Sequence, residues 1–269
     1  MRVDAELLRK RAEHNEGMLS SLEEVALHQL EIERIENFDK LCRHIKILLL
    51  QNNLIPAMEN LGKLKELEYL NLALNNISRI EGVEACESLS KLDLTCNFIE
   101  CGALLESLYN LRKCASIREL YLLGNPCADF AGCRALVAAV VDQLVSLDGK
   151  EILPSERIQA KQAYDTLVDQ LEAKIAELAA QDAQKTDEER ANAYTKEKRT
   201  AMYKEHAQEE QQKKQASDET TPAPKPESSM YLRSGEMRQC NEGKYEYELR
   251  EYDDPQYSTF TLKLPRYMD

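Results

Sequence analysis

Hydrophobic residues in the first half of the chain recur with a fixed period. One copy of the pattern places Leu67, Leu70, Leu72 and Ile77 at the spacing L-x-x-L-x-L-x-x-N-x-I, with Asn75 at its ninth position. The other copies begin, in chain order, at Leu22, Ile45, Leu89 and Ile117. The five starts are separated by 23, 22, 22 and 28 residues. A fixed period of this length indicates repeated structural units that stack side by side and share one core.

The period and its residues are typical of leucine-rich repeats, which run to about 20–29 residues each. The L-x-L core predicts a short strand that turns its leucines inward, and the later Ile or Met closes one coil against the next. The asparagine follows the strand, where its amide can pair with backbone groups of the adjacent coil that burial would leave unpaired. We assign this structural role to Asn53, Asn75, Asn97 and Asn125. The sequence therefore predicts an α/β fold, a leucine-rich-repeat solenoid of about five repeats of the 22-residue type.

The two open ends of such a stack need covers. Residues 4–14 predict a short helix with Leu7, Leu8 and Ala12 toward the first coil, and residues 133–147 carry a helical apolar stripe after the last coil. Asp148 and Gly149 then suit a structural turn, since Gly accepts a positive φ and Asp bonds nearby amides. We expect an N-terminal cap over residues 1–21, repeats over 22–132 and a C-terminal cap over 133–154.

Composition changes after the second cap. Residues 155–221 hold no Gly or Pro, so we expect a long charged helix over 155–215, solvated or partly disordered from residue 182. Its early apolar seam, from Tyr164 to Leu178, is expected to pack on the repeat cap or on a partner. A Pro-rich linker is predicted over 216–229. Alternation around 245–249 and 260–264 then predicts two strands within 230–269, too few for an independent domain.

Strand residues between the buried leucines face the concave side of a solenoid. Ile47, Leu49, Tyr69, Tyr121 and Leu123 give this side an apolar and aromatic strip, which marks a partner surface when it is exposed. The candidate partner-binding residues are His28, Ile47, Leu49, Gln51, Tyr69, Asn71, Lys91, Asp93, Glu119, Tyr121 and Leu123. The alternative is that terminal segments fold over the strip.

Charge and motifs narrow the classes of function. Asp and Glu total 48 against 35 Lys and Arg, and the net charge of -13 repels a phosphate backbone, so we expect no nucleic-acid partner. The longest apolar runs are too short to span a bilayer, so we expect no membrane association and a cytoplasmic protein. Eight Cys and four His show no zinc spacing, and no nucleotide-binding or catalytic motif is found. We therefore expect no cofactor, no metal and no enzymatic activity, with proteins as partners.

The sequence between the repeat positions resembles a known family, the TilB-homologue dynein axonemal assembly factors. The resemblance rests on segments 12–15 (AEHN), 27–29 (LHQ), 47–55 (ILLLQNNLI), 67–77 (LEYLNLALNNI), 91–95 (KLDLT), 124–128 (GNPCA), 147–152 (LDGKEI) and 154–158 (PSERI). It implies a cytoplasmic factor for preassembly of axonemal dynein arms, needed for motile cilia or flagella. Its implied partners are axonemal dynein subunits, heat-shock chaperones and other assembly factors. It also implies a C-terminal CS domain, of which residues 260–269 resemble only the opening strands, so we expect an incomplete CS-like β segment over 230–269.

These observations favour a non-enzymatic protein-binding scaffold. A regulatory subunit of a protein phosphatase is the alternative, because repeats of the 22-residue type also occur in such regulators. A resident structural component of the axoneme or basal body is a third possibility, which would place the protein in the cilium or flagellum as well as in the cytoplasm.

Overall fold

The computed structural model describes residues 1–12, 15–186, 193–205, 209, 247–251 and 258–262. The chain forms two compact units, Met1–Ala207 and Gln208–Asp269. The first unit holds the repeats, and the second holds one pair of strands among its described residues.

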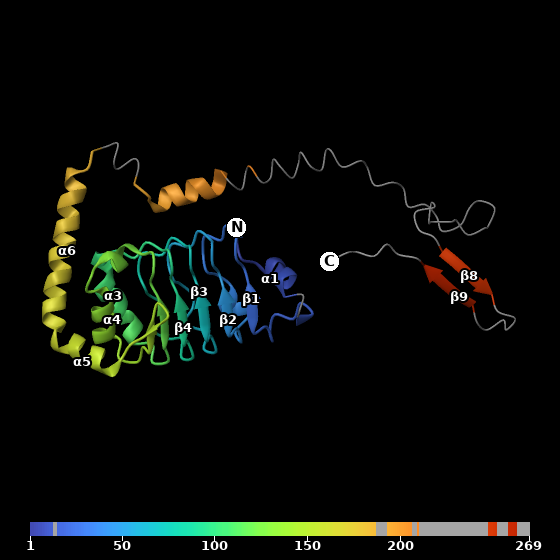
Figure 1. Cartoon of the computed structure of the whole chain (residues 1–269), viewed down its shortest axis with the longest axis horizontal. Coiled ribbons are helices and arrows are strands. Elements are labelled where there is room, and N and C mark those ends of the chain that lie inside the picture. The colour runs from blue at the N-terminus through green and yellow to red at the C-terminus, as the bar shows by residue number, and fades with distance from the viewer. Residues whose placement is uncertain (13–14, 187–192, 206–208, 210–246, 252–257, 263–269) are drawn as a thin grey trace. The chain divides into compact units, whose positions relative to one another are not determined.

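A sheet of seven strands in chain order runs through the first unit (Figure 1). The strands are β1 (Glu24–Ala26), β2 (Ile47–Leu49), β3 (Tyr69–Asn71), β4 (Lys91–Asp93), β5 (Glu119–Tyr121), β6 (Ser146–Leu147) and β7 (Lys150–Glu151). Neighbours from β1 to β6 are parallel, and β7 pairs with β6 antiparallel. The architecture is therefore α/β with a parallel sheet, as the repeat pattern predicts.

The core lies behind the central residue of each strand. Val25, Leu48, Leu70, Leu92 and Leu120 are fully buried, and their strand neighbours on the other face are at most half-buried. This alternation follows from the two-residue period of a strand. One face of the sheet therefore seals the core and the other remains open.

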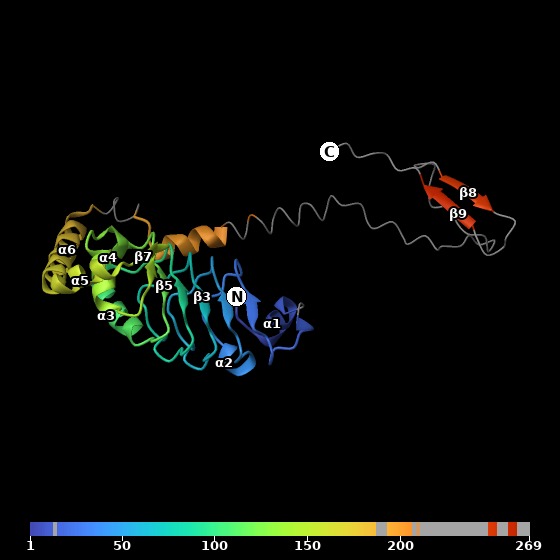
Figure 2. The same cartoon turned by 60° about the horizontal axis from the view of Figure 1, so that its bottom comes forward.

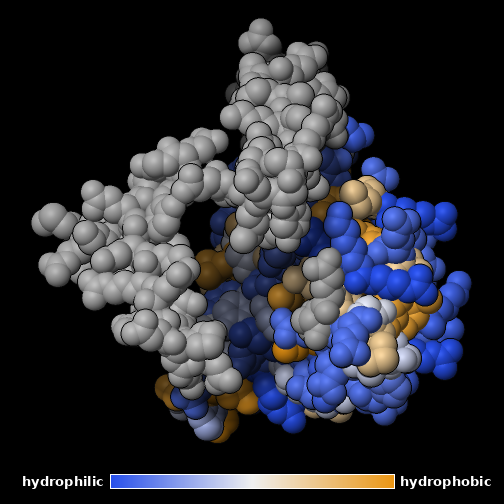
Figure 3. Space-filling view, turned by 90° about the vertical axis from the view of Figure 1, so that its right-hand side faces the viewer, coloured by the Kyte–Doolittle hydropathy of each residue, from blue (hydrophilic) through white to orange (hydrophobic). Residues whose placement is uncertain are grey.

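Short helices cover the outer side and the ends of the sheet. The strands lie on the inner side of the curve, with α2 (Phe38–Leu41) and α3 (Cys101–Arg112) on its outer side (Figure 2). At the β1 end lies α1 (Ala5–Arg11), where the Asp4 carboxylate accepts a hydrogen bond from the Leu7 amide at 2.8 Å and Leu8 is buried. Seen from that end, polar residues dominate the described surface and apolar residues form small separate patches (Figure 3).

The other end of the sheet is packed by helices. A 3-10 turn, η2 (Pro126–Asp129), leads to α4 (Cys133–Val140), and α5 (Pro154–Gln162) and α6 (Tyr164–Gln184) follow. The α6 helix packs on α3 and α4 and buries Leu171. Of the predicted seam, Tyr164, Val168 and Ile175 pack against the core, whereas Leu178 is exposed. The seam therefore lies on this end of the repeat unit.

The structure corrects the expectation of one charged helix over 155–215. The α6 helix ends at Gln184, where Lys185 turns extended, and a separate helix runs over 196–205. This second helix lies on the loops after β2, β3 and β4, where Arg199 is buried, so it is not a solvated continuation of α6. Packing stabilises a short helix more than propensity does. Residues 206–208 and 210–229, with the rest of the helix and the linker that we expect, lie outside the described residues.

The second unit contains an antiparallel pair, β8 (Tyr247–Glu251) and β9 (Ser258–Leu262). Tyr247 pairs with Leu262, and Leu249 pairs with Phe260. These strands overlap the two stretches whose alternation predicts strands. Throughout the described part of the chain, no helix combines the length and apolar character that crossing a membrane requires.

Candidate functional site

The candidate residues form rows across the open face of the sheet because the strands are in register. One row runs through Glu24, Ile47, Tyr69, Lys91 and Glu119. The next row, two residues along each strand, runs through Ala26, Leu49, Asn71, Asp93 and Tyr121. His28, Gln51 and Leu123 follow their strands by two residues. Glu24 is exposed and the other side chains of the two rows are half-buried, so solvent reaches this face of the sheet.

Lys91 is the centre of a cluster on this face. Its ammonium lies 5.0 Å from the centroid of the Tyr69 ring and 5.3 Å from that of Tyr121. The same ammonium is 3.4 Å from a carboxylate oxygen of Glu119. Tyr69 accepts a hydrogen bond from the Asn71 amide at 3.0 Å, and the Tyr121 hydroxyl donates to Glu119 at 3.5 Å. Two rings thus hold one cation, and each phenol is itself held by a polar neighbour.

Two groups of this cluster keep their protons at neutral pH. Burial, followed by the nearby Asp93 carboxylate, raises the pKa of Tyr69, so its hydroxyl stays protonated. Burial alone lowers the pKa of Lys91, but Tyr121, Glu119 and Tyr69 together raise it more, and the net shift is upward. The site therefore presents a constant cation, Lys91, beside the neutral phenol of Tyr69.

Side-chain to backbone bonds fix two further residues of the face. The Asn71 amide oxygen accepts from the amide of Ala73 at 3.0 Å, and the Asp93 carboxylate accepts from the amide of Thr95 at 3.0 Å. Each bond spans two residues at the point where a strand ends. These side chains are therefore positioned before any partner arrives, which lowers the entropy cost of binding.

The β1–β2 end of the face has a different character. Ile47 and Leu49 are apolar, whereas His28 Nδ1 and Gln51 Oε1 are buried without a hydrogen-bond partner among the described residues. A buried polar atom without a partner raises the free energy of the folded site. The β1–β2 end therefore combines an apolar surface with two polar atoms that are costly to bury.

The structure does not gather all the candidates into one spot. His28 follows β1 and Leu123 follows β5, four strands away, which corresponds to about 19 Å at the usual strand spacing. Leu123 is 56% exposed, the most open of the set. A partner that contacts both ends must span all five strands.

Each of the four structural asparagines bonds to the backbone of adjacent coils. The Asn97 side-chain oxygen accepts from the amide of Ile77 at 3.0 Å, and its side-chain nitrogen donates to the carbonyls of Leu72 at 2.9 Å and Leu94 at 3.0 Å. The equivalent bonds are made by Asn53, Asn75 and Asn125. All four are buried, so they form a continuous ladder along the solenoid.

Asp148 ends that ladder. Its carboxylate accepts from the amides of Leu122 at 2.7 Å and Leu123 at 3.1 Å. Asp148 and Gly149 have φ values of 54° and 75°, which the turn between β6 and β7 requires. Both residues are therefore part of the turn that closes the last strand and take no visible part in the open face.

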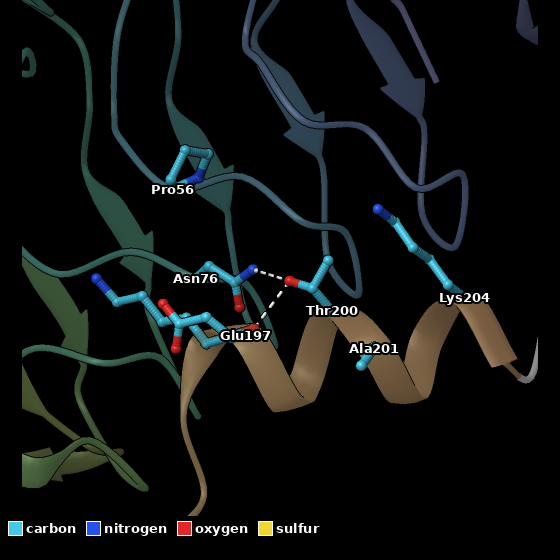
Figure 4. A pocket seen from close by; sticks show the side chains of 7 residues that line it. Pro56, Asn76, Glu197, Thr200, Ala201 and Lys204 are labelled. Carbon is cyan, nitrogen blue, oxygen red and sulfur yellow. Dashed lines mark hydrogen bonds between the residues drawn. The ribbon is translucent and has the colours of Figure 1, made fainter.

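Sequence reasoning missed a second surface, where helix 196–205 meets the loops. A groove of about 490 Å³ lies beside this helix (Figure 4). Its lining residues are Pro56, Asn76, Lys196, Glu197, Thr200, Ala201 and Lys204. The contacts that seat the helix come from Tyr194, Arg199 and Tyr203. Two tyrosines in a stretch otherwise rich in charge are the one sequence signal that points to it.

The described residues hold no group of three or more His, Cys, Asp or Glu that could bind a metal ion. Burial raises the pKa of Cys42 to about 11 and is the main cause that raises that of Cys86 to about 12. These thiols are therefore protonated and poor nucleophiles at neutral pH.

Comparison with known proteins identifies relatives of both parts of the chain. Residues 199–269 match a family model described as "Dynein axonemal assembly factor 11-like, CS domain". A CS-domain segment is therefore present, and its match begins at residue 199, whereas we expect the segment from residue 230. Among solved structures, the crystal structure of the Drosophila melanogaster SNF/U2A′ complex contains a similar chain, with a TM-score of 0.54 and 26% identity. That similarity covers 63% of this chain and 99% of the other.

Curated relatives match the repeat part more closely. Dynein axonemal assembly factor 11 of Mus musculus is 51% identical over 170 residues, 63% of this chain and 35% of the mouse protein. The protein of the same name from Trypanosoma brucei brucei is 46% identical over 166 residues, 62% of this chain and 43% of that protein. Protein tilB of Drosophila melanogaster is 45% identical over 161 residues, 59% of this chain and 39% of the fly protein.

The chain spans less than half the length of these relatives. The matches nevertheless confirm the resemblance that segments 12–15 to 154–158 indicate. Both matched parts of the chain are thus similar to the same group of proteins, the dynein axonemal assembly factor 11, or tilB, proteins.

Proposed function

We propose that this chain is a non-enzymatic protein-binding scaffold for the cytoplasmic preassembly of axonemal dynein arms. The names of its relatives support a role in axonemal dynein assembly. The observation that supports a protein-binding role is the open face of the sheet, where Lys91 lies over the rings of Tyr69 and Tyr121. Its partners are axonemal dynein subunits, heat-shock chaperones or other dynein assembly factors.

The chemistry of the open face suits a protein partner. Aromatic side chains dominate the energy of protein interfaces. Tyr69 lies on β3, the middle one of the five strands, and Tyr121 lies on β5, two strands away. Lys91 and Glu119 add charges of both signs, which fix the register of a partner more than they strengthen its binding. Ile47 and Leu49 extend the apolar surface toward β1.

The repeat unit suits a scaffold because its ends are closed. We infer five repeats, one for each parallel strand from β1 to β5, with residues 1–21 and 133–154 as caps. The complete burial of Leu8 in α1 and of Val137 in α4 supports this division. A capped solenoid stays soluble and rigid, so its inner face is preformed.

Affinity capture from a ciliated-cell lysate tests the proposal. The intact chain is compared with a triple variant, Tyr69→Ala, Tyr121→Ala and Leu123→Ala, and with a control triple variant that removes exposed apolar side chains elsewhere, Met18→Ala, Val145→Ala and Ile158→Ala. We expect dynein subunits or assembly chaperones on the intact chain and on the control, and their loss from the first variant. Retention by the first variant would contradict a site on the open face, and capture of a phosphatase catalytic subunit would favour the alternative function.

Cell fractionation separates a scaffold for assembly from a structural component. An assembly factor stays in the detergent-soluble cytoplasmic pool. A resident component of the axoneme or basal body stays with the detergent-insoluble skeleton, and that result would contradict the proposal.

A further inference from the structure

Helix 196–205 lies across three loops of the repeat unit, far along the chain from the residues that it touches. Residue 199 contacts the loop after β3, 124 residues earlier, and residue 203 contacts the loop after β2, 151 residues earlier. The helix lies beside these loops in both cartoon views (Figures 1 and 2). The preceding helix, α6, lies at the end of the sheet that is farther from α1. The chain therefore returns to the middle of the repeats before it leaves the first unit.

Arg199 is the main anchor of this helix. Its guanidinium lies 4.4 Å from the centroid of the Phe98 ring and 5.4 Å from that of Tyr194. The two rings stack on each other with centroids 5.8 Å apart. Arg199 also donates to the carbonyl of Asn75 and, through Nε, to the Tyr194 hydroxyl at 2.9 Å. Only 7% of Arg199 is exposed, which is rare for an arginine and requires such partners.

Two more bonds fix the helix beyond the anchor, at Thr200 and Tyr203. The Asn76 amide donates to the Thr200 hydroxyl at 3.2 Å (Figure 4). The Tyr203 hydroxyl donates to the carbonyl of Asn52 at 3.1 Å. Asn52 and Asn76 occupy loops of neighbouring coils. The spacing of the loops is therefore matched by the spacing of residues along one face of the helix.

Those loops are suited to receive such a helix. They present backbone carbonyls, which accept hydrogen bonds from an arginine, and the flat ring of Phe98, which stacks on a guanidinium. A helix of about ten residues is marginal in water unless it packs on something. The ordered helix and the buried arginine therefore depend on each other.

We propose that the edge formed by Asn52, Asn75, Asn76 and Phe98 is an intramolecular docking site for the chain's own helix 196–205, anchored by Arg199. The first unit extends to residue 207, whereas the CS-domain match begins at residue 199. The opening residues of the CS-matched segment thus belong physically to the repeat unit. The docked helix fixes the point from which the chain departs toward residues 208–269.

Hydrogen exchange of the full chain, measured by mass spectrometry, tests the docking. The amides of residues 199–205 should exchange about 10- to 100-fold more slowly than in an unstructured chain, because the docked helix holds its hydrogen bonds. Arg199→Ala and Phe98→Ala, one on each side of the contact, should each remove most of that protection. Lys204→Ala, an exposed change on the same helix, is the control and should leave it intact.

Exchange of β2, β3 and β4 in the same samples reports whether the repeat fold survives each substitution. Loss of protection in helix 196–205 with unchanged strands supports docking. Exchange at the unstructured rate in the intact chain, or full protection in both Arg199→Ala and Phe98→Ala, would overturn it. Arg199→Lys keeps the charge but not the flat guanidinium, so we expect it to behave like the alanine variant, and full protection there would overturn the role of stacking.

Discussion

Replacing Asn97 with alanine tests the asparagine ladder that joins the coils. Asn97 is buried, and its side chain accepts one hydrogen bond from the amide of Ile77 and donates to the carbonyls of Leu72 and Leu94, with a longer bond of 3.4 Å to the carbonyl of Thr95. Alanine removes all of these bonds at once. Because the site is buried, each backbone group must find another partner or stay unpaired.

The bonds that remain decide the magnitude. The carbonyl of Leu72 also accepts from Asn75 at 3.1 Å, and that of Leu94 also accepts from Asn125 at 2.8 Å, so both keep a partner. The amide of Ile77 loses its side-chain acceptor, and an unpaired buried donor costs about 1–3 kcal/mol. With a smaller contribution from the two weakened carbonyls and the space left behind, we expect a loss near the upper end, about 2–3 kcal/mol.

Thermal and urea unfolding, followed by far-UV circular dichroism, measure the effect. For a unit of this size the melting temperature should fall by about 4–12 °C. Thr95→Ala is the matched control, a change in the same loop. Thr95 bonds Asp93 through its backbone amide, which alanine keeps, so the free energy of unfolding should stay within about 0.5 kcal/mol of that of the intact chain. An Asn97→Ala variant that unfolds together with the control would refute the ladder as a source of stability.

Three further predictions follow from packing and titration. Gly82→Ala and Gly149→Ala both place a side chain at positive φ, but only at Gly82 would the new Cβ lie 2.5 Å from a main-chain oxygen. Gly82→Ala should therefore lower the free energy of unfolding in urea by at least about 1 kcal/mol more than Gly149→Ala does. Equal losses would contradict the close contact. Leu70→Ala should cost about 2–5 kcal/mol, because Leu70 is fully buried in β3, which has a paired strand on each side, and a smaller loss would show a looser core. The pKa values of Cys42 and Cys86 in the folded protein, about 11 and about 12, lie above the ordinary thiol pKa of 9.0. The free energy of unfolding should therefore fall as pH rises above about 9, by up to about 1.4 kcal/mol per pH unit for each thiol. Alanine at both positions should reduce that slope but not abolish it, because burial also raises the pKa of Cys101 and Cys114. An unchanged slope would assign it to other groups.

The repeat fold could be predicted from sequence because its information is local and periodic. Each L-x-L core specifies one strand, and the shared period places Leu48, Leu70 and Leu92 side by side without any knowledge of distant contacts. The same register made the rows of the open face predictable. The period could not predict the cluster around Lys91, because the contacts of Lys91 with the two tyrosine rings depend on side-chain rotamers and on residues of neighbouring strands.

Helix 196–205 could not be placed because nothing periodic links it to the repeats. Its composition resembles a solvated helix, and the burial of Arg199 depends on Phe98, a residue about one hundred positions earlier whose ring lies outside the repeat's apolar set. A single specific anchor of this kind leaves little trace in hydrophobic periodicity. Tertiary contacts therefore override the local pattern at this surface.

The most direct test of the scaffold is a photo-crosslink from the open face to its partner. A photoreactive phenylalanine analogue replaces Tyr121 on the open face in one sample and Tyr109, an exposed tyrosine on α3 at the outer side, in another. The two chains are irradiated in ciliated-cell lysate, and crosslinked proteins are identified by mass spectrometry. We expect axonemal dynein subunits or dynein assembly proteins to crosslink to position 121 and not to position 109. Crosslinks to those proteins from position 109 alone, or equally from both positions, would contradict binding at the open face.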